Sequence, residues 1–461
     1  MRLRQRWENS LLGNMPAEKV NIVSLGCPKN DSDTEVMIGI LASHGFEFVS
    51  EPEDAQVLLI NTCAFIRPAV EESLGFLREA LEQKRRNPDV KIVVTGCLPQ
   101  RWRLAGEEVP PEIDCVLGAG EYRHIVEALR EISGGGKIVR IGEKPRFMPT
   151  EATPRVRITP PHYAYVKIAD GCDNHCSYCL IPSLRGGYRS RSVKDVVSEA
   201  RAAAETGAKE IVLVGQDTTS FGSDRGSPDS LPKLLRALSG ISGIEWIRVL
   251  YTYPTHFSDS LIEAIRDLPN VVPYVDIPLQ HSHDDILARM NRRGTSADTA
   301  QLVEKLRNRI SDVAIRTTFI VGFPGETESH FEHLLDFVER MCFDRVGIFA
   351  YSAEEGTAAV AFADQVPDEI KEARRDTAMK VQREVSLAIN KGLIGRRLRV
   401  LIESESTEDQ SVAVGRTYRD APEIDGQIFV EGGSPRAGTM IDVEVTGAEE
   451  YDLNGKRVDE T

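Results

Sequence analysis

The 461-residue sequence lacks a long hydrophobic run and a secretory leader pattern. No apolar stretch reaches the ~18 residues that a membrane-spanning helix needs, so we expect no membrane span. The N-terminal segment MRLRQRWENSLLGNMP is basic but has no apolar core, which argues against a secretory signal. We therefore expect a protein of the reducing cytoplasm, where the eight cysteines are metal ligands or buried residues rather than disulfides.

The chain also has fewer basic than acidic residues. The chain has 56 Lys and Arg against 71 Asp and Glu, a net charge of −15. This balance disfavours a protein whose main partner is a phosphate backbone, because such proteins carry clustered Lys and Arg. It suits a basic protein partner. With 41% hydrophobic residues, the chain has ample material for a core.

The sequence pattern divides into segments, beginning with an extension over residues 1–18. Residues 19–145 alternate apolar strands (20–25, 56–62 and 90–95) with helices (34–44 and 70–83), which predicts an open parallel α/β sheet. Residues 146–160 are rich in Pro, Arg and Thr without a period and are interpreted as a linker. The predicted fold class is therefore α/β.

Residues 161–385 contain six predicted strands with helices between them: 163–169, 210–215, 246–251, 271–277, 314–321 and 345–351. Ser192 is the expected N-cap and Gly207 the stop of the first of these helices, over 193–206. Six βα units in a row predict a partial (β/α)6 barrel, with its chemistry at the C-terminal strand ends. Residues 392–456 have short β runs at 397–403, 411–415, 427–431 and 439–446, which predict a small antiparallel β-barrel.

Cys172, Cys176 and Cys179 form a CxxxCxxC loop directly after the strand at 163–169. Three thiolates on one loop can hold three irons of a [4Fe-4S] cube, and the fourth iron stays open to chelate a cofactor. A structural zinc site normally has four protein ligands, often in paired CxxC motifs, and no such partner is nearby. The spacing resembles that of the radical S-adenosylmethionine superfamily, whose open iron chelates the amino and carboxylate groups of that cofactor. Reductive cleavage then yields a 5′-deoxyadenosyl radical.

The superfamily resemblance implies further contacts with S-adenosylmethionine. Tyr178 stands where the superfamily keeps an aromatic residue against the adenine. Gln280 follows the fourth strand and is a candidate near the ribose. Two turns at the ends of the second and fifth strands supply the other candidates, which are Gly215, Gln216, Asp217, Gly322, Gly325 and Glu326. Each turn alone could be an ordinary βα turn; beside the cysteine loop, the cofactor interpretation is favoured. The pattern identifies no catalytic acid or base.

A second set of cysteines is dispersed along the first segment. Cys27, Cys63 and Cys97 each end one of its predicted parallel strands. Because the C-terminal ends of parallel strands share one edge of a sheet, we expect the three thiols to converge there. The alternative is coincidence, since buried cysteine is common in strands. Three at the same topological position favour a second, auxiliary [4Fe-4S] cluster.

The remaining cysteines and two histidines receive structural interpretations. Cys115 and Cys342 lack a position at a predicted strand end, so we expect both to pack in a core. His281 and His283 lie in a loop near the end of the fourth strand. They could face the pocket, but a role in stabilising the loop is favoured.

The whole pattern, from about residue 20 to 455, resembles the methylthiotransferases. The matching segments are SLGCPKN (24–30), NTCAFI (61–66), VTGC (94–97), IADGCDNHCSYCLIPSLRG (168–186), DIPLQH (276–281) and FIVGFPGET (319–327). The resemblance identifies the C-terminal segment as a TRAM domain. It implies that the radical abstracts a hydrogen atom, that the auxiliary cluster holds the sulfur, that a further S-adenosylmethionine supplies the methyl group, and that both clusters face one cavity.

One branch of this family modifies adenosine in transfer RNA, and another modifies the β-carbon of an aspartate in small-subunit ribosomal protein S12. Pro-Lys-Asn after Cys27, Ser183 in the 181–186 segment, and GRTYRDAPEIDG (415–426) resemble the protein-modifying branch. Residues 396–461 also carry 8 Lys and Arg against 15 Asp and Glu, a net charge of −7. Such a barrel repels phosphates and attracts a basic protein, unless these acids are only a solvated surface.

The sequence thus predicts a methylthiotransferase that acts on ribosomal protein S12, free or in the small ribosomal subunit. The resemblance implies a reducing partner such as flavodoxin or ferredoxin, and RNA contact through the TRAM domain stays open. The rival enzyme is a transfer-RNA adenosine methylthiotransferase. The rival from another class is a non-catalytic iron–sulfur or zinc RNA-binding protein.

Overall fold

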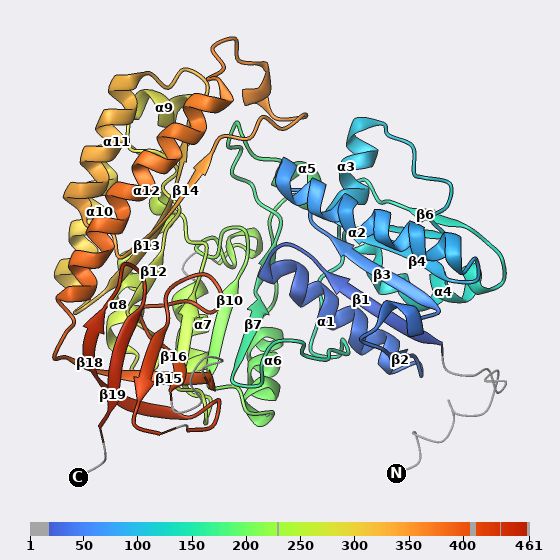
Figure 1. Ribbon diagram of the computed structural model, residues 1–461, viewed down its shortest axis with the longest axis horizontal. Coiled ribbons are helices and arrows are strands. Elements are labelled where there is room, and N and C mark those ends of the chain that lie inside the picture. Colours follow the sequence, from blue (N-terminus) through green and yellow to red (C-terminus); the bar gives the residue numbers. More distant parts are fainter. Residues whose placement is uncertain (1–17, 228–229, 406–411, 434, 459–461) are drawn as a thin grey trace. The chain divides into compact units, whose positions relative to one another are not determined.

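The computed structural model describes residues 18–227, 230–405, 412–433 and 435–458. The chain forms two compact units: residues 1–147 with 153–156, and residues 148–152 with 157–461. Figure 1 shows the first unit in blue to cyan and the second in green to red. Within the part of the chain that is described, no helix is both long enough and apolar enough to cross a bilayer.

The first unit is a six-stranded sheet in the order β2-β1-β3-β4-β5-β6, and every neighbouring pair is parallel. Its strands are β1 (Lys19–Ser24), β2 (Glu47–Phe48), β3 (Val57–Thr62), β4 (Lys91–Gly96), β5 (Cys115–Gly118) and β6 (Ile138–Arg140). Its helices are α1 (Pro28–Ala42), α2 (Arg67–Arg86), α3 (Cys97–Ala105) and α4 (Ile125–Ser133), with 3-10 turns η1 (Pro52–Asp54) and η2 (Glu121–His124). Apolar side chains of α1 and α4 pack on one face of the sheet and form its core.

The predicted open parallel sheet is confirmed, but several of its elements were missed. Strands β2, β5 and β6 were not predicted, because their apolar runs are short, and neither were helices α3 and α4. Helix α1 begins at Pro28 rather than at residue 34, with Cys27 as its N-cap. Its first turns, PKNDSD, read as a polar loop. They are helical because the fold buries Lys29 and Asn30 at the sheet edge, where tertiary contacts outweigh local propensity.

The second unit contains a partial barrel of six parallel strands. They are β7 (Tyr163–Lys167), β10 (Glu210–Val214), β11 (Trp246–Val249), β12 (Tyr274–Asp276), β13 (Ala314–Val321) and β14 (Arg345–Ala350). They pair as the sheets β11-β10-β7 and β12-β13-β14, and a single parallel bridge between Ile247 and Val271 joins the two. The predicted fold class is confirmed.

Helices cover the outer face of the barrel. They are α6 (Val193–Glu205), α7 (Ser230–Ser239), α8 (Asp259–Asp267), α9 (Asp284–Arg289), α10 (Ser296–Arg309), α11 (Glu328–Met341) and α12 (Asp368–Lys391). The short elements α5 (Ile181–Arg185), β8 (Ala169–Asp170), β9 (Arg189–Ser190), η3 (Ser223–Arg225), η4 (Pro254–His256) and η5 (Ala358–Ala361) lie in its loops. Ser192 caps α6 as predicted, because its hydroxyl accepts the backbone N–H of Asp195.

The C-terminal strands form a closed five-stranded barrel in the order β15-β16-β17-β19-β18. They are β15 (Arg397–Glu405), β16 (Ala413–Thr417), β17 (Ile428–Glu431), β18 (Met440–Ala448) and β19 (Leu453–Arg457). All pairs are antiparallel except β17 with β19. The small barrel is confirmed. The fifth strand, β19, was missed, and residue 411, where the second run was expected to start, lies outside the described residues.

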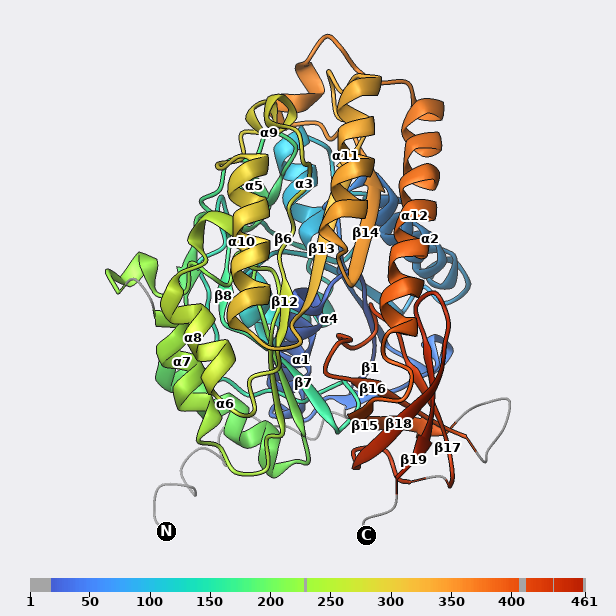
Figure 2. The same cartoon turned by 90° about the vertical axis from the view of Figure 1, so that its left-hand side faces the viewer.

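This small barrel docks against the N-terminal ends of the large barrel's strands (Figures 1 and 2). Glu210, the first residue of β10, is fully buried and bonds both Arg248 and Arg416, at 2.7 and 2.8 Å. Arg345, the first residue of β14, donates to Asp420 at 2.7 Å. The segment 415–426 therefore forms the buried contact between the two barrels. The opposite ends of the parallel strands stay available for a site.

Candidate active site

The loop of Cys172, Cys176 and Cys179 follows β7 and β8 at the C-terminal end of the barrel. Residue 171 must be glycine, because its backbone is left-handed (φ +80°) and a Cβ there would lie 2.2 Å from the carbonyl oxygen of Gly187. The N–H of Cys172 donates to the carbonyl of Gly186, at 3.2 Å. The loop is thus folded back on itself, with all three cysteines within eight residues.

The surroundings of the three thiols fit a metal cluster. Burial raises the pKa of Cys172 to about 11 and that of Cys179 to about 12, so neither thiol ionises at neutral pH without a metal. The backbone N–H of Asn174 points at the Cys172 sulfur from 3.4 Å. Backbone N–H groups aimed at sulfur are a feature of iron–sulfur sites, where they stabilise charge on the thiolate. The donor set fits a [4Fe-4S] cluster.

A buried arginine that the sequence analysis missed lies beside this loop. The Nη1 atom of Arg292 is 3.7 Å from the Cys176 sulfur and 3.4 Å from the hydroxyl of Tyr178. Its Nη2 donates to the carbonyl of Pro278, and its guanidinium lies 4.5 Å from the ring centroid of Tyr253. Arg292 follows α9 in a stretch with no motif, so only the fold places this fixed positive charge next to the thiols.

The predicted turn after β10 meets the cysteine loop. The Nε2 of Gln216 donates to Asp170 at 3.0 Å, but its buried Oε1 has no hydrogen-bond partner among the described residues. An orphaned acceptor beside the cluster loop fits a cofactor that brings its own N–H donor, such as the methionyl amine. Burial by itself raises the pKa of Asp170, but Lys167, Arg185 and Arg189 lower it to about 2. This carboxylate therefore stays charged and orients Gln216.

Asp217 connects the same turn to the cluster loop. Its carboxylate accepts hydrogen bonds from Asn174 at 2.9 Å and from Ser220 at 2.8 Å, and the ring of His256 lies 3.2 Å away. Burial alone would raise the pKa of Asp217, but hydrogen bonds from His256, Thr219 and Ser220 hold it below its usual value. These groups line a cavity of about 390 Å³, together with Asp173, Tyr188 and Arg293. His256 was not predicted, because it lies in the isolated turn η4.

The predicted turn after β13 meets the cysteine loop from the other side. Phe323 packs edge-on against Tyr178, with ring centroids 6.5 Å apart. Glu326 is buried, and it accepts the N–H of Gly322 at 2.9 Å and a bond from Arg374 at 2.9 Å. Glu326 therefore holds the turn in shape. Gly322 must be glycine because a Cβ there would lie 2.2 Å from the side chain of Lys371.

The loop after β12 carries the remaining candidates. Gln280 has a left-handed backbone (φ +74°). Its N–H donates to the carbonyl of Thr318, and its carbonyl accepts the N–H of Ile320, both at 2.7 Å. The buried ring of His281 accepts the N–H of His283 at 2.9 Å, and His283 caps α9. The favoured role of both histidines in stabilising the loop agrees with these contacts.

The cysteines of the first unit follow three neighbouring strands, β1, β3 and β4. A Cβ on Gly26 would lie 2.5 Å from the Cβ of Cys63, and one on Gly96 would lie 2.4 Å from the carbonyl oxygen of Thr62. The loops of Cys27 and Cys97 thus press against the loop of Cys63 from both sides. Because Cys27 caps α1 and Cys97 begins α3, two helix N-termini lie at this edge of the sheet. The set fits a second cluster.

The side-chain amides of two asparagines form hydrogen bonds between these loops. The amide of Asn30 donates to the carbonyls of Leu25 and Thr62, at 2.8 and 2.9 Å. The amide of Asn61 donates to the carbonyl of Asn30 at 3.0 Å. Both belong to segments quoted for the family resemblance, but their role was not predicted, since a hydrogen-bond partner 30 residues away has no local signal.

The other two cysteines differ from each other. Cys115 begins β5 and is fully buried in the core, as predicted. The prediction for Cys342 is wrong, because its side chain is exposed. Cys342 is the left-handed C-cap of α11 (φ +47°), a position that turns the side chain away from the core.

Three family models match the chain. The Radical SAM superfamily matches residues 166–338, the uncharacterized protein family UPF0004 matches residues 19–118, and the TRAM domain matches residues 394–458. These regions contain the cysteine loop, the three dispersed cysteines and the small barrel, respectively.

Curated relatives are similar over nearly the whole chain. Ribosomal protein uS12 methylthiotransferase RimO of Heliobacterium modesticaldum is 47% identical over 444 residues, which are 96% of this chain and 95% of the relative. The protein of the same name from Desulfitobacterium hafniense is 45% identical over 446 residues, covering 96% and 99%. Among solved structures, the radical S-adenosylmethionine methyltransferase TsrM of Kitasatospora setae is similar in fold. It has a TM-score of 0.56 and 15% identity, covering 85% of this chain and 81% of its own.

Proposed function

Because the chain belongs to the family of ribosomal protein uS12 methylthiotransferases called RimO, we propose that it adds a methylthio group to the β-carbon of an aspartate of ribosomal protein uS12. The observation that carries the proposal is the pairing of end-to-end similarity to these enzymes with two cysteine trios, each at the C-terminal ends of parallel strands. The enzyme is a radical S-adenosylmethionine transferase, and its cofactors are that molecule and two [4Fe-4S] clusters.

The residues divide between the two clusters. Cys172, Cys176 and Cys179 hold the cluster that binds S-adenosylmethionine, and the trio of the first unit holds the auxiliary cluster: Cys27, Cys63 and Cys97. When bound, these groups supply the radical that removes hydrogen from an unactivated carbon and the sulfur that replaces it. The first cluster needs an electron from a reducing partner such as flavodoxin or ferredoxin.

The chain's own residues position the cofactor. Gln216 offers its orphaned Oε1 to the methionyl amine, while its amide is fixed on Asp170. Tyr178 packs near the adenine, backed by Phe323. Arg292 places a buried positive charge beside Cys176, which opposes the negative charge that reduction adds. Gly215, Asp217, Gln280, Gly322, Gly325 and Glu326 shape the turns around the cofactor.

The choice of a protein target rests on charge. The C-terminal barrel carries a net charge of −7, and two of its eight basic residues, Arg416 and Arg419, are buried against the large barrel. Asp420 is buried with them. The exposed surface is therefore poor in the positive charge that RNA binding needs, and it suits a Lys- and Arg-rich ribosomal protein. The segment 415–426 also has a structural role, since it forms the contact between the barrels.

A reconstituted reaction tests the proposal. The anaerobically purified protein, with both clusters, is incubated with S-adenosylmethionine, a reductant and either small ribosomal subunits or transfer RNA. We expect a methylthio group on the target aspartate of uS12 and none on adenosine. The Cys172→Ala and Cys63→Ala variants should form no product, whereas Cys342→Ser, an exposed cysteine, should be as active as the wild type. Methylthiolated adenosine instead would identify the transfer-RNA enzyme.

A further inference from the structure

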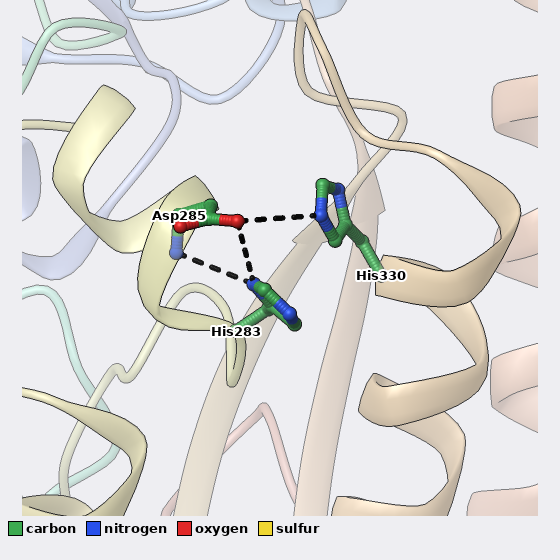
Figure 3. Close-up of side chains that lie close together, drawn as sticks. All are labelled: His283, Asp285 and His330. Carbon is green, nitrogen blue, oxygen red and sulfur yellow. Dashed lines mark hydrogen bonds and ion pairs between the residues drawn. The ribbon is translucent and has the colours of Figure 1, made fainter.

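Three potential metal ligands, one of them exposed, lie close together in the large barrel (Figure 3). His283 and Asp285 come from the loop after β12 and the first turn of α9, and His330 comes from the first turn of α11. Asp285 Oδ2 is 3.9 Å from Nδ1 of His283 and 3.8 Å from Nε2 of His330. One ligand atom from each of the three residues falls within 4.8 Å of the others.

Further imidazoles surround this group. The ring centroids of His283 and His330 are 4.2 Å apart, and His333, one turn along α11, is 5.2 Å from His283. Burial, together with the neighbouring imidazoles, lowers the pKa of His333 below its usual value. Burial likewise lowers the pKa of His281, next to His283. The geometry therefore brings several imidazole rings close to one carboxylate.

Helix capping explains part of the arrangement. Nδ1 of His283 accepts the N–H of Asp285, and Nδ1 of His330 accepts the N–H of Thr327, both at 3.2 Å. These bonds are long for N–H donors. They account for one nitrogen of each ring, but not for the Asp285 carboxylate, which points between the two rings although its side chain is 76% exposed (Figure 3).

We propose that His283, Asp285 and His330 form a zinc site, through Nδ1, Oδ2 and Nε2 respectively. Zinc bonds of about 2.0–2.2 Å in a tetrahedron set ligand atoms roughly 3.3–3.5 Å apart. The observed 3.8 and 3.9 Å therefore need to contract by a few tenths of an ångström. Zinc at Nδ1 of His283 would replace the hydrogen bond that this nitrogen accepts from the N–H of Asp285. His330 would move its proton from Nε2 to Nδ1 and give up the bond from the N–H of Thr327. The exposed side leaves the fourth position to water.

The site joins two loops that lead to the candidate active site. His283 follows Gln280 and His281 in the loop after β12, and His330 follows the turn of Gly322 and Glu326. His281 already lies 3.3 Å from Glu326 inside the protein. A metal bound by His283 and His330 ties the same two loops a second time. The site stands on its own ligands, so it does not depend on the proposed activity.

Zinc binding to the holoprotein tests this site. Protein with both clusters, in a Cys342→Ser background, is dialysed against buffered Zn²⁺, and zinc and iron are counted in the same sample. We expect one zinc per chain, with unchanged iron and with imidazole scattering at the zinc absorption edge. The Asp285→Asn and His330→Gln variants should bind zinc at least about tenfold more weakly. His44→Gln, which removes an exposed histidine of the first unit, should bind as the wild type does.

Asp285 is exposed, so its replacement leaves the fold intact and any loss of zinc is local. The proposal is overturned if the wild type takes up no zinc beyond that of Asp285→Asn. It is equally overturned if His44→Gln loses as much zinc as His330→Gln, because the metal would then bind scattered surface histidines.

Discussion

Replacing Glu210 by glutamine removes the one carboxylate that lies between two buried arginines at the contact of the two barrels. Arg416 keeps a second carboxylate, Glu403, at 2.7 Å. Arg248 loses its charged partner and keeps the carbonyl of Tyr418, the ring of Tyr274 and at most the neutral amide oxygen of the introduced glutamine. Its Nη2 already lacks a hydrogen-bond partner among the described residues. Breaking a buried pair in this way costs about 3–5 kcal/mol. Because Arg416 stays paired, we expect the lower end.

Hydrogen exchange of the holoprotein measures this cost locally. Opening of the contact exposes the amides of β16 and of residues 418–426. A loss of about 3 kcal/mol makes these amides exchange roughly a hundredfold faster, since each 1.4 kcal/mol is a factor of ten. Asp442→Asn is the matched control. It breaks an exposed pair with Arg397 on the same small barrel and should cost under ~1 kcal/mol.

The double variant Glu210→Met with Arg248→Met separates charge from shape. It removes the unpaired guanidinium and should recover most of the lost protection. The reasoning is refuted if Glu210→Gln exchanges no faster than Asp442→Asn, or if the double variant opens more readily than Glu210→Gln.

The same carboxylate predicts a pH dependence. Burial opposes its ionisation, but the guanidiniums of Arg248 and Arg416 hold the pKa of Glu210 below its usual value. A carboxylate with a depressed pKa stabilises the folded state above its unfolded pKa, about 4.3, and this contribution is lost as the pH falls through the folded pKa. Protection of residues 418–426 should therefore fall on acidification below pH ~4, and less so in Glu210→Gln.

Three further outcomes are expected. Cys97→Ala should lower the iron content from about eight to about four per chain, whereas Cys342→Ser should leave it unchanged; metal analysis under anaerobic conditions decides, and equal iron in both would contradict the assignment. Arg292→Gln should shift the midpoint potential of one cluster to more negative values, by at most roughly 0.2 V for a charge at about 4 Å. Arg292→Lys, which keeps the charge, should restore most of the potential. An unchanged redox titration would exclude the electrostatic role. Asn30→Ala should destabilise the edge of the first sheet by about 1–3 kcal/mol, and the exposed Asn87→Ala should not, as judged by exchange of residues 24–34.

The sequence predicted the features that carry a local pattern. Buried strands such as β3 and β10 contain continuous apolar runs, and the helix at 193–205 has a capping serine at its start. Cysteines at the ends of three parallel strands are expected to converge, and the close approach of Gly26 to Cys63 supports this prediction.

Features that depend on distant partners were not predictable. The first turns of α1 are polar, and only the sheet edge that buries Asn30 makes them helical. Arg292 lies against the Cys176 sulfur, which is more than a hundred positions earlier in the chain. Cys342 was expected in a core because it lacks a position at a predicted strand end, but the left-handed end of α11 turns it outward. The resemblance of segment 415–426 to the protein-modifying branch was predicted, but the pairing of its charged side chains with the large barrel was not.

The most direct test of the proposed function is the mass of ribosomal protein uS12 from cells that lack this gene, compared with cells complemented by the wild type, Cys172→Ala or Cys342→Ser. We expect the methylthio group on uS12 only with the wild type and Cys342→Ser, while methylthiolated transfer-RNA nucleosides stay the same in every strain. If uS12 keeps its methylthio group in the deletion strain, or if the transfer-RNA nucleosides lose theirs, the account is contradicted.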